Sequence, residues 1–242
     1  MPKSPKIPVP PSSHVSIGST SSKPSTASSQ MTTTPVTRPD RTTFSTVIDA
    51  DHSTINQFAA LLKRATTPEE RSRLILEVAW RLVRHDFSEE MVMRPAFIAH
   101  LGQEGQEMAD HDRKDHTAAR KELLDLLDSG LDLNEFPTRI GDLFAELAEH
   151  MKVESGQYVP KLEQLLNISE SQRLGWEYLH TQILTPQIEY LDSNGKRTRL
   201  WKSAEDYVRS EPNRFLDIWH GYMAGNIKLI AESSGVRVPP RL

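Results

Sequence analysis

The chain has no cysteine among its 242 residues. This absence excludes disulfides, thiolate catalysis, zinc sites built from thiolates and iron–sulfur clusters held by cysteine. No apolar run approaches the roughly 20 residues that a membrane-spanning helix requires, so we expect no association with a membrane. Hydrophobic residues make up only 37% of the chain, which is low for a globular protein.

Part of this apolar deficit lies at the start of the chain, where positions 1–42 include 17 Ser or Thr and 8 Pro. Such a segment cannot bury enough apolar surface to offset its ordering entropy, so we predict a disordered tail over residues 1–42. The tail lacks the apolar core of a secretory signal, and we expect a cytoplasmic protein. Its Ser-rich, acid-poor composition leaves mitochondrial import as the alternative, although the many prolines argue against a targeting helix.

The charge of the chain is unevenly distributed. The predicted tail carries five Lys or Arg against one acid, Asp40, while the formal net charge of the whole chain is −4. The rest of the chain therefore carries a net charge of about −8. Because phosphate binding needs clustered Lys and Arg, we expect no nucleic-acid partner.

Four helices are predicted in the middle of the chain, within a domain over residues 46–167. Apolar side chains recur there every three or four residues, as on the buried face of a helix. Helix-start residues such as Thr67-Pro68 and the stop at Ser129-Gly130 mark the boundaries. The connections within the first and second pair are short, so each pair should pack antiparallel. The predicted ranges are 49–64, 68–95, 104–128 and 136–166.

One pattern of polar residues occurs twice in these helices. Its parts are a histidine preceded by aspartate, and a second histidine followed by Glu four residues later and by Pro ten residues later. The same offset along the chain, to within one residue, relates every part of one copy to the other. The copies are Asp51-His52 with His85-x3-Glu89-x5-Pro95, and Asp115-His116 with His150-x3-Glu154-x5-Pro160.

Every histidine and glutamate of this pattern falls on a stripe that is otherwise apolar. One such residue is easily a hydrogen-bonded core histidine, but six buried polar groups are costly unless something satisfies them together. A pair of metal ions would do so, since residues four apart share a helix face and a glutamate can bridge two ions. Imidazole with carboxylate suits iron, and also manganese or zinc. The candidate ligands are His52, His85, Glu89, His116, His150 and Glu154.

Other polar residues near the pattern have alternative interpretations. Asp112 shares a face with His116, and Asp86 adjoins His85, so either is a candidate additional ligand or a hydrogen-bond acceptor for one. Asp51 and Asp115 are predicted to cap a helix or to accept an imidazole N–H rather than to bind metal. Three further histidines are expected to be ordinary surface or structural residues: His100, His111 and His220.

The doubled pattern resembles the hemerythrin-like, or HHE cation-binding, family over roughly residues 46–167. The matched pieces are the two Asp-His pairs, the two His-x3-Glu pairs, Met93-Arg94-Pro95 and Tyr158-Val159-Pro160. The resemblance implies an all-α fold, an up-down four-helix bundle that holds a non-haem di-iron centre. Members of the family bind dioxygen, sense oxygen or iron, or store metal.

Two positions depart from the oxygen-carrying hemerythrins. Those proteins have a histidine four residues before the His116 position, where this chain has Asp112. They also end with His-x4-Asp, where this chain has His150-x3-Glu154. The chain is thus more similar to carboxylate-richer members, which include an iron- and oxygen-sensing domain of ubiquitin-ligase subunits. A more anionic site stabilises ferric iron, which counts against simple reversible oxygen carriage.

Residues 168–242 are predicted to form a small, mostly helical extension that packs on the bundle. An Asn194-Gly195 turn favours a hairpin, and helices are expected from Ser203 and from Asn213 to about Ser233. Three of the four tryptophans lie here, and we interpret them as packing anchors, with a partner-binding platform as the alternative. They are Trp176, Trp201 and Trp219.

The sequence leaves two classes of function open. The first is a di-iron protein that binds or senses iron or oxygen, with dioxygen or another small oxidant as its partner and no catalytic residues. The second is a di-iron enzyme that activates dioxygen or peroxide. We favour the first because the sequence shows no independent sign of a substrate pocket beside the metals. A metal-free scaffold would have to bury the six polar side chains unaided. Nothing in the sequence identifies a protein partner.

Overall fold

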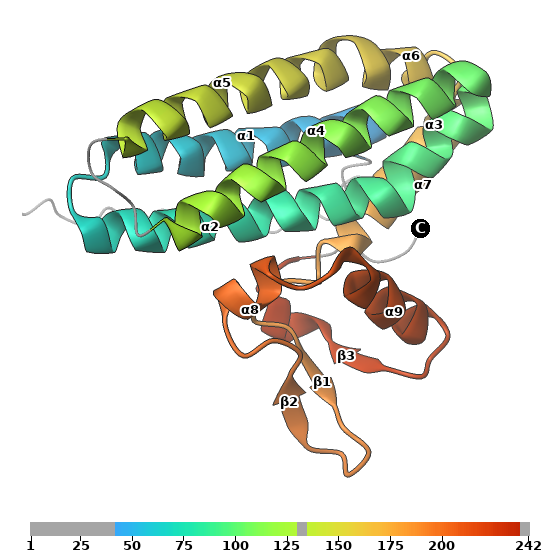
Figure 1. Ribbon diagram of the computed structural model, residues 1–242. Coiled ribbons are helices and arrows are strands. Elements are labelled where there is room, and N and C mark those ends of the chain that lie inside the picture. The colour runs from blue at the N-terminus through green and yellow to red at the C-terminus, as the bar shows by residue number, and fades with distance from the viewer. Residues whose placement is uncertain (1–41, 130–134, 238–242) are drawn as a thin grey trace, which may run out of the picture. The chain divides into compact units, whose positions relative to one another are not determined.

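The structure, a computed structural model, describes residues 42–129 and 135–237. These residues form a mostly helical unit (Figure 1). The predicted disordered tail lies, apart from Thr42, outside the described residues. None of the helices in the described ranges is long and apolar enough to cross a bilayer.

Four long helices lie side by side as a bundle, as the sequence predicted (Figure 1). Two shorter helices, α3 and α6, extend the second and fourth of them. The first helix begins earlier than expected, at Phe44, because Thr43 caps it by accepting the N–H of Thr46. The helices of the bundle are α1 (Phe44–Arg64), α2 (Pro68–Ser88), α3 (Arg94–Leu101), α4 (Gln103–Asp128), α5 (Phe136–Val153) and α6 (Val159–Glu163).

The two proline-containing motifs each form one widened, π-helical turn. These turns span Glu89–Met93 and Glu154–Tyr158, and each begins at a glutamate of the repeated pattern. Proline cannot donate a backbone hydrogen bond and clashes with the carbonyl four residues earlier in a regular helix. The wider turn relieves this clash ahead of Pro95 and Pro160 and lets the helix continue.

The residues after the bundle form a further helix, a small sheet and two short helices. The sheet is antiparallel with the order β2-β1-β3. The predicted hairpin is confirmed, and Gly195 supplies its left-handed backbone position at φ 76°. These elements are α7 (Ile168–Thr181), β1 (Glu189–Leu191), β2 (Arg197–Arg199), α8 (Ala204–Val208), α9 (Pro212–Met223), β3 (Lys228–Ile230) and a 3-10 turn (Ala231–Ser234).

The last predicted helix was wrong in its second half. It ends at Met223 rather than near Ser233, and residues 228–230 form strand β3. Gly225 takes a left-handed conformation at φ 76°, and the carbonyl of Gly221 accepts two backbone N–H groups beyond the helix. This C-terminal turn reverses the chain, so that the following residues pair with β1.

The C-terminal elements pack on the bundle through aromatic side chains. Trp201, Tyr207 and Phe215 are each at most 1% exposed. Trp201 stacks on Phe215, and Tyr207 contacts both rings edge-on. They belong to one apolar cluster with core residues of α1, α2, α4 and α5. Arg120 of α4 adds a polar tie by donating to the carbonyl of Val208.

The bundle core consists of two apolar clusters with a polar layer between them. One cluster includes Ile55, Leu82 and Leu123, and the other includes Ile48, Met93 and Met108. Along each helix the polar residues of the repeated pattern fall between these two sets of side chains. The fold therefore places a buried band of charge across an otherwise apolar interior.

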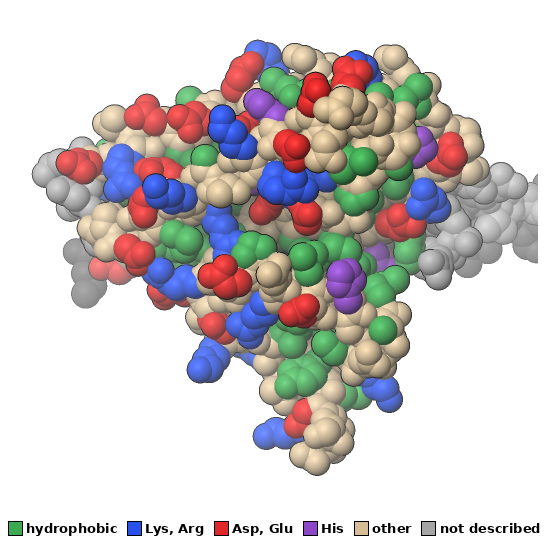
Figure 2. Space-filling view, turned by 45° about the vertical axis from the view of Figure 1, so that its right-hand side comes forward, with side chains coloured by type: hydrophobic (Ala, Val, Ile, Leu, Met, Phe, Trp, Pro, Cys, Tyr) green, Lys and Arg blue, Asp and Glu red, His purple; other side chains and the backbone are tan. Residues whose placement is uncertain are grey.

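The surface shows charges of both signs. On the face drawn in Figure 2, acidic and basic side chains are interspersed over the bundle and the C-terminal elements. Such mixing gives no extended basic area on that face.

The junction of α3 and α4 offers a test of packing. A Cβ atom on Gly105 would lie 2.0 Å from the backbone oxygen of Phe97, whereas one on Gly141 would meet nothing within 4 Å. We expect Gly105→Ala to cost about 1–3 kcal/mol by overpacking, lowering the melting temperature by about 5 °C. Gly141→Ala is the matched control and should leave it unchanged or slightly higher. Thermal unfolding followed by circular dichroism measures both, and equal melting temperatures would contradict the close packing.

Candidate metal centre

All six predicted ligands converge in the polar layer of the bundle. Their donor atoms form two groups, and within each group the atoms lie within 4.8 Å of one another. Asp112, one of the two additional candidates, joins the second group, while Asp86 lies outside both and pairs with Arg94 at 2.7 Å. The groups are His52, His85, Glu89 and Glu154, and Asp112, His116, His150 and Glu154.

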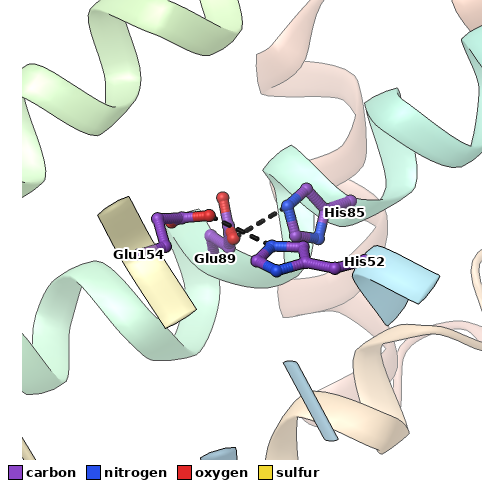
Figure 3. A group of neighbouring side chains, drawn as sticks. All are labelled: His52, His85, Glu89 and Glu154. Atoms are coloured by element: carbon purple, nitrogen blue, oxygen red, sulfur yellow. Dashed lines mark ion pairs between the residues drawn. The ribbon is translucent and has the colours of Figure 1, made fainter. Parts of the chain in front are cut away.

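The first group is drawn in Figure 3, where two imidazole rings and two carboxylates point toward one another. His52 Nε2 lies 3.1 Å from Glu154 Oε2, and His85 Nε2 lies 3.0 Å from Glu89 Oε1. Adjacent ligands of one metal ion with bonds of about 2.1 Å lie about 3 Å apart. The spacing in this group therefore matches that of neighbouring ligands.

The second group brings two ring nitrogens face to face. His116 Nε2 and His150 Nε2 are 3.1 Å apart, and Asp112 Oδ1 lies 3.4 Å from each of them. Two imidazoles and a carboxylate that aim at one point are the donors expected around a divalent cation. The second group thus has a carboxylate of its own in Asp112.

The two glutamates lie between the groups. Glu89 has one oxygen 3.0 Å from His85 and the other 2.8 Å from His116. Glu154 Oε2 lies 3.1 Å from His52 and 3.4 Å from His150. Each glutamate therefore reaches a histidine of each group, which is the position of a carboxylate that bridges two ions.

Unsatisfied polar atoms provide a test of whether cations fit here. Buried polar atoms are nearly always hydrogen-bonded in folded proteins. In the part of the chain that the structure describes, most buried side-chain atoms without a hydrogen-bond partner belong to this cluster. They are His52 Nε2, His85 Nε2, Asp112 Oδ1 and both carboxylate oxygens of Glu89 and of Glu154. Metal coordination would satisfy them all, so the donor set fits a pair of cations.

The histidines of the first group have opposite pKa shifts. Burial lowers the pKa of His52 to about 3, and the charge of His85 adds to that effect. His52 is thus a neutral imidazole at pH 7, the form that binds metal. Burial also opposes a charge on His85, but the Glu89 and Asp51 carboxylates outweigh it and raise the pKa of His85 to about 9.

The two bridging candidates also differ. Burial and the charge of Glu89 raise the pKa of Glu154 well above its usual range. Burial acts in the same direction on Glu89, but the charges of His85 and His116 prevail and lower the pKa of that carboxyl below its usual value. The surrounding side chains thus shift the pKa values of the two carboxyls in opposite directions. Cations between them would favour the ionised form of both.

The outward ring nitrogens of three histidines are held by side chains. Asp51 Oδ2 lies 3.1 Å from His85 Nδ1, and Asp115 Oδ2 lies 3.1 Å from His150 Nδ1. Both aspartates therefore accept an imidazole N–H, which was one of the two roles predicted for them; the other was to cap a helix. Such a contact orients the ring with Nε2 inward and makes it a better ligand.

His52, the third of these histidines, is held through a different contact. Its Nδ1 lies 3.0 Å from Ser155 Oγ, and that hydroxyl donates to Asp49 Oδ1 at 2.7 Å. Ser155 belongs to the second π-helical turn, directly after Glu154. The widened turn thus supplies both a candidate ligand and the support for another.

Two buried arginines balance the buried acids. Arg94 donates through Nε to Asp112 and through its terminal nitrogens to Asp86 and Glu90. Arg84 donates to Asp51 at 3.1 Å. One oxygen of Asp112 therefore pairs with Arg94, and the other faces the histidines. The distance from Arg94 to Glu89 is longer, at 3.8 Å.

Several contributors to the site were missed by sequence reasoning. Arg94 was noted only as part of a motif, and Ser155 lies next to a candidate ligand without a pattern of its own. Tyr178 lies on α7, outside the predicted bundle; it is buried, and its hydroxyl is 2.8 Å from His85 Nδ1 and 3.1 Å from Asp51 Oδ2. No spacing in the sequence relates Tyr178 to His85, so only the packing of α7 against α1 could show it.

The three histidines expected to be ordinary lie outside the two donor groups. His111 is exposed, as predicted, with a side chain 55% accessible, and it lies 3.5 Å from Asp115. His100 and His220 are also on the surface.

Comparisons with known proteins agree with this geometry. The hemerythrin HHE cation-binding domain family matches residues 43–162. An uncharacterized hemerythrin-like protein of Schizosaccharomyces pombe is 28% identical over 145 residues, which cover 60% of this chain and 71% of that relative. No solved structure matches the chain significantly.

The bridging position of the glutamates can be tested by substitution. Gln keeps the volume of Glu but not its charge, so Glu89→Gln or Glu154→Gln should each lose about one of two bound metal ions. His111→Ala and His100→Ala are controls that should keep the wild-type metal content. Elemental analysis of purified protein measures the ratio. If both Gln variants retain two ions per chain, the bridges lie elsewhere, with Asp112 the next candidate.

The role of Tyr178 can be tested in the same way. Removing its hydroxyl should lower metal affinity about 10- to 100-fold, the usual effect of losing a side chain that orients a metal-binding histidine. Tyr178→Phe should show this loss in a competition titration against a metal-binding dye. Tyr222→Phe removes a comparable contact of 3.0 Å, to His180, and should leave the affinity unchanged. Equal affinities for the two variants would show that Tyr178 only fills space.

Proposed function

Because residues 43–162 of this chain form a hemerythrin HHE cation-binding domain, we propose that it is a non-haem di-iron protein that binds or senses iron or oxygen. One observation carries this proposal: two groups of buried donors share Glu154, and Glu89 reaches a histidine of each. A single ion would leave one group unsatisfied. The mixture of imidazole and carboxylate favours iron, with manganese or zinc as alternatives.

The side chains of the layer have distinct parts in this proposal. A pair of irons, when bound, would supply electrons and open coordination positions for binding or sensing dioxygen. His52 and His85 would hold one ion, and His116, His150 and Asp112 would hold the other. The apolar clusters on both sides keep bulk water from reaching the layer along the bundle axis. Dioxygen or another small oxidant is the expected partner.

Sensing or storage suits the ligand set better than reversible oxygen carriage. Asp112 adds a third carboxylate to the two glutamates, all of them fully buried. Negative charge close to iron stabilises the ferric state, which makes oxidation harder to reverse. A protein of this kind would report exposure to oxygen or the supply of iron through occupancy of the site.

A di-iron enzyme remains the alternative, and one observation favours it. A cavity of about 320 Å³ lies against His150 at the edge of the layer, large enough for a small substrate. An enzyme would consume dioxygen or peroxide catalytically in the presence of an oxidisable compound. A sensor or store would consume no more than the oxidation of its own iron requires, and an oxygen electrode separates the two.

The charge and composition of the chain support proposals about its partners and its location in the cell. The acidic balance of the chain beyond residue 42 and the mixed charges in Figure 2 support a function without nucleic acid. We propose a cytoplasmic location, with mitochondria as the alternative because of the Ser-rich, acid-poor start of the chain. A fluorescent fusion at the C-terminus would distinguish the two.

Metal content and colour test the central proposal. Protein purified after expression with adequate iron should contain close to two irons per chain and absorb in the near ultraviolet, as an oxo-bridged diferric pair does. Removing the iron with a chelator should lower the melting temperature by several degrees, because ions that bind only the folded bundle stabilise it. Protein that stays metal-free after anaerobic ferrous reconstitution would refute the proposal. Two colourless zinc ions would refute iron but keep the metal site.

A further inference from the structure

The two halves of the repeat carry matching histidines and glutamates but different surroundings. Helices α4 and α5 of the second half leave a cavity of about 320 Å³ between them. The helices equivalent to them in the first half are α1 and α2. The two halves can be compared position by position through the repeat. Aligning His52 with His116 pairs the positions of α1 with those of α4, and aligning His85 with His150 pairs those of α2 with those of α5. The cavity residues that the argument uses are His111, Asp115, Ala119, Glu146, Glu149 and His150.

Charge at the cavity mouth is reversed between the halves. Glu146 and Glu149 on α5 correspond to Arg81 and Arg84 on α2. Arg81 lies over the ring of Phe58, 3.4 Å from its centroid, and Arg84 binds Asp51. The second half thus presents carboxylates where the first half presents guanidinium groups.

The size of the side chains at the cavity floor also differs between the halves. Ala119 on α4 corresponds to Ile55 on α1, which is 1% exposed within the apolar core. His111, at the mouth, corresponds to the buried Val47. Large apolar side chains fill the first half at the positions where the second half is open or polar.

The supporting aspartates are covered to different degrees. Asp51 is 5% exposed and is closed over by Tyr178 and Arg84. The side chain of Asp115 is 34% exposed at the cavity. Solvent therefore reaches the second histidine–aspartate pair and is excluded from the first.

Side chains of the kinds that bind metal ions lie in a row from the cavity mouth to the polar layer. His111 Nδ1 lies 3.5 Å from Asp115 Oδ2, and that oxygen lies 3.1 Å from His150 Nδ1. The exposed fraction of these side chains falls along the path from 55% to 34% to 6%. Beyond His150 Nε2, 3.4 Å away, lies Asp112 Oδ1, a buried oxygen without a hydrogen-bond partner.

We propose that the cavity between α4 and α5 is the route by which divalent metal ions enter and leave the centre. This inference rests on the proposed metal-binding function. Asp115 and Glu146 attract the cation at the mouth, where Lys152 pairs with Glu149 at 3.0 Å and offsets part of its charge. The cation then exchanges water for carboxylate and imidazole as it moves inward. The group of donors around His150 is filled first and emptied first.

Cobalt(II) tests the route because it replaces ferrous iron without being oxidised by air and its visible absorption reports binding. Apoprotein is mixed with cobalt chloride at low ionic strength in a stopped-flow instrument. In the variant Glu146→Arg/Glu149→Arg, the second half acquires the arginines of the first. We expect cobalt uptake to slow by about tenfold while the final content stays at two ions per chain. Added salt should remove most of the difference.

Matched variants separate the route from the overall charge of the protein. Asp217→Arg/Glu232→Arg makes the same change of charge at exposed positions in the C-terminal elements and should load at the wild-type rate. His111→Ala should slow loading without changing the final content. Ala119→Ile fills the floor without any change of charge, and it tests the route even if the double arginine variant does not fold.

The outcomes distinguish the route from the metal site itself. Wild-type rates in both Glu146→Arg/Glu149→Arg and Ala119→Ile, with two ions bound, would overturn the route and leave the centre intact. Equal slowing in the Asp217→Arg/Glu232→Arg control would also overturn it, since the effect would then be one of net charge. A wild-type chain that binds no cobalt and no iron would overturn the proposed function, and the route with it.

Discussion

Balancing buried negative charge is the constraint on which the rest of the structure depends. Three fully buried carboxylates, Glu89, Asp112 and Glu154, share one layer of the bundle. Arg94 neutralises Asp112 directly, but its distance to Glu89 is 3.8 Å. The remaining charge must be met by protons on histidine and glutamate or by cations. The apolar clusters on both sides supply the packing that lets the bundle accommodate such a layer.

The widened turns convert a sequence pattern into the geometry of that layer. Each proline forces a turn with one extra residue, and the glutamate that begins the turn points into the bundle. In both halves the histidine four residues earlier stays on a regular helix. The same local device therefore sets the angle between histidine and glutamate twice, and antiparallel packing brings the two copies to one place.

The convergence of these six polar side chains was predictable from the sequence because helical spacing decides which residues share a face. His85 and Glu89 are four residues apart, and their repeat occurs on the fourth helix of the bundle. Choosing between Asp86 and Asp112 was not possible, since that depends on how each helix is rotated. The structure places Asp112 in the layer and Asp86 on Arg94, nearer to the surface.

Contacts between distant parts of the chain could not be predicted from the sequence either. Strand β3 exists because it pairs with β1, which precedes α8 and α9, and Tyr178 reaches His85 across 93 residues of sequence with no periodicity to relate them.

The C-terminal part of the chain adds to the inequality between the two halves of the site. The repeated pattern places the two His–Asp pairs at equivalent positions of the bundle. Helix α7 covers the first pair with the hydroxyl of Tyr178, and no described residue from α7 onward lines the cavity beside the second. An element beyond the repeat thus encloses one end of the site, while the other end keeps its access to solvent. Two copies of one histidine–glutamate pattern can in this way differ in their access to solvent.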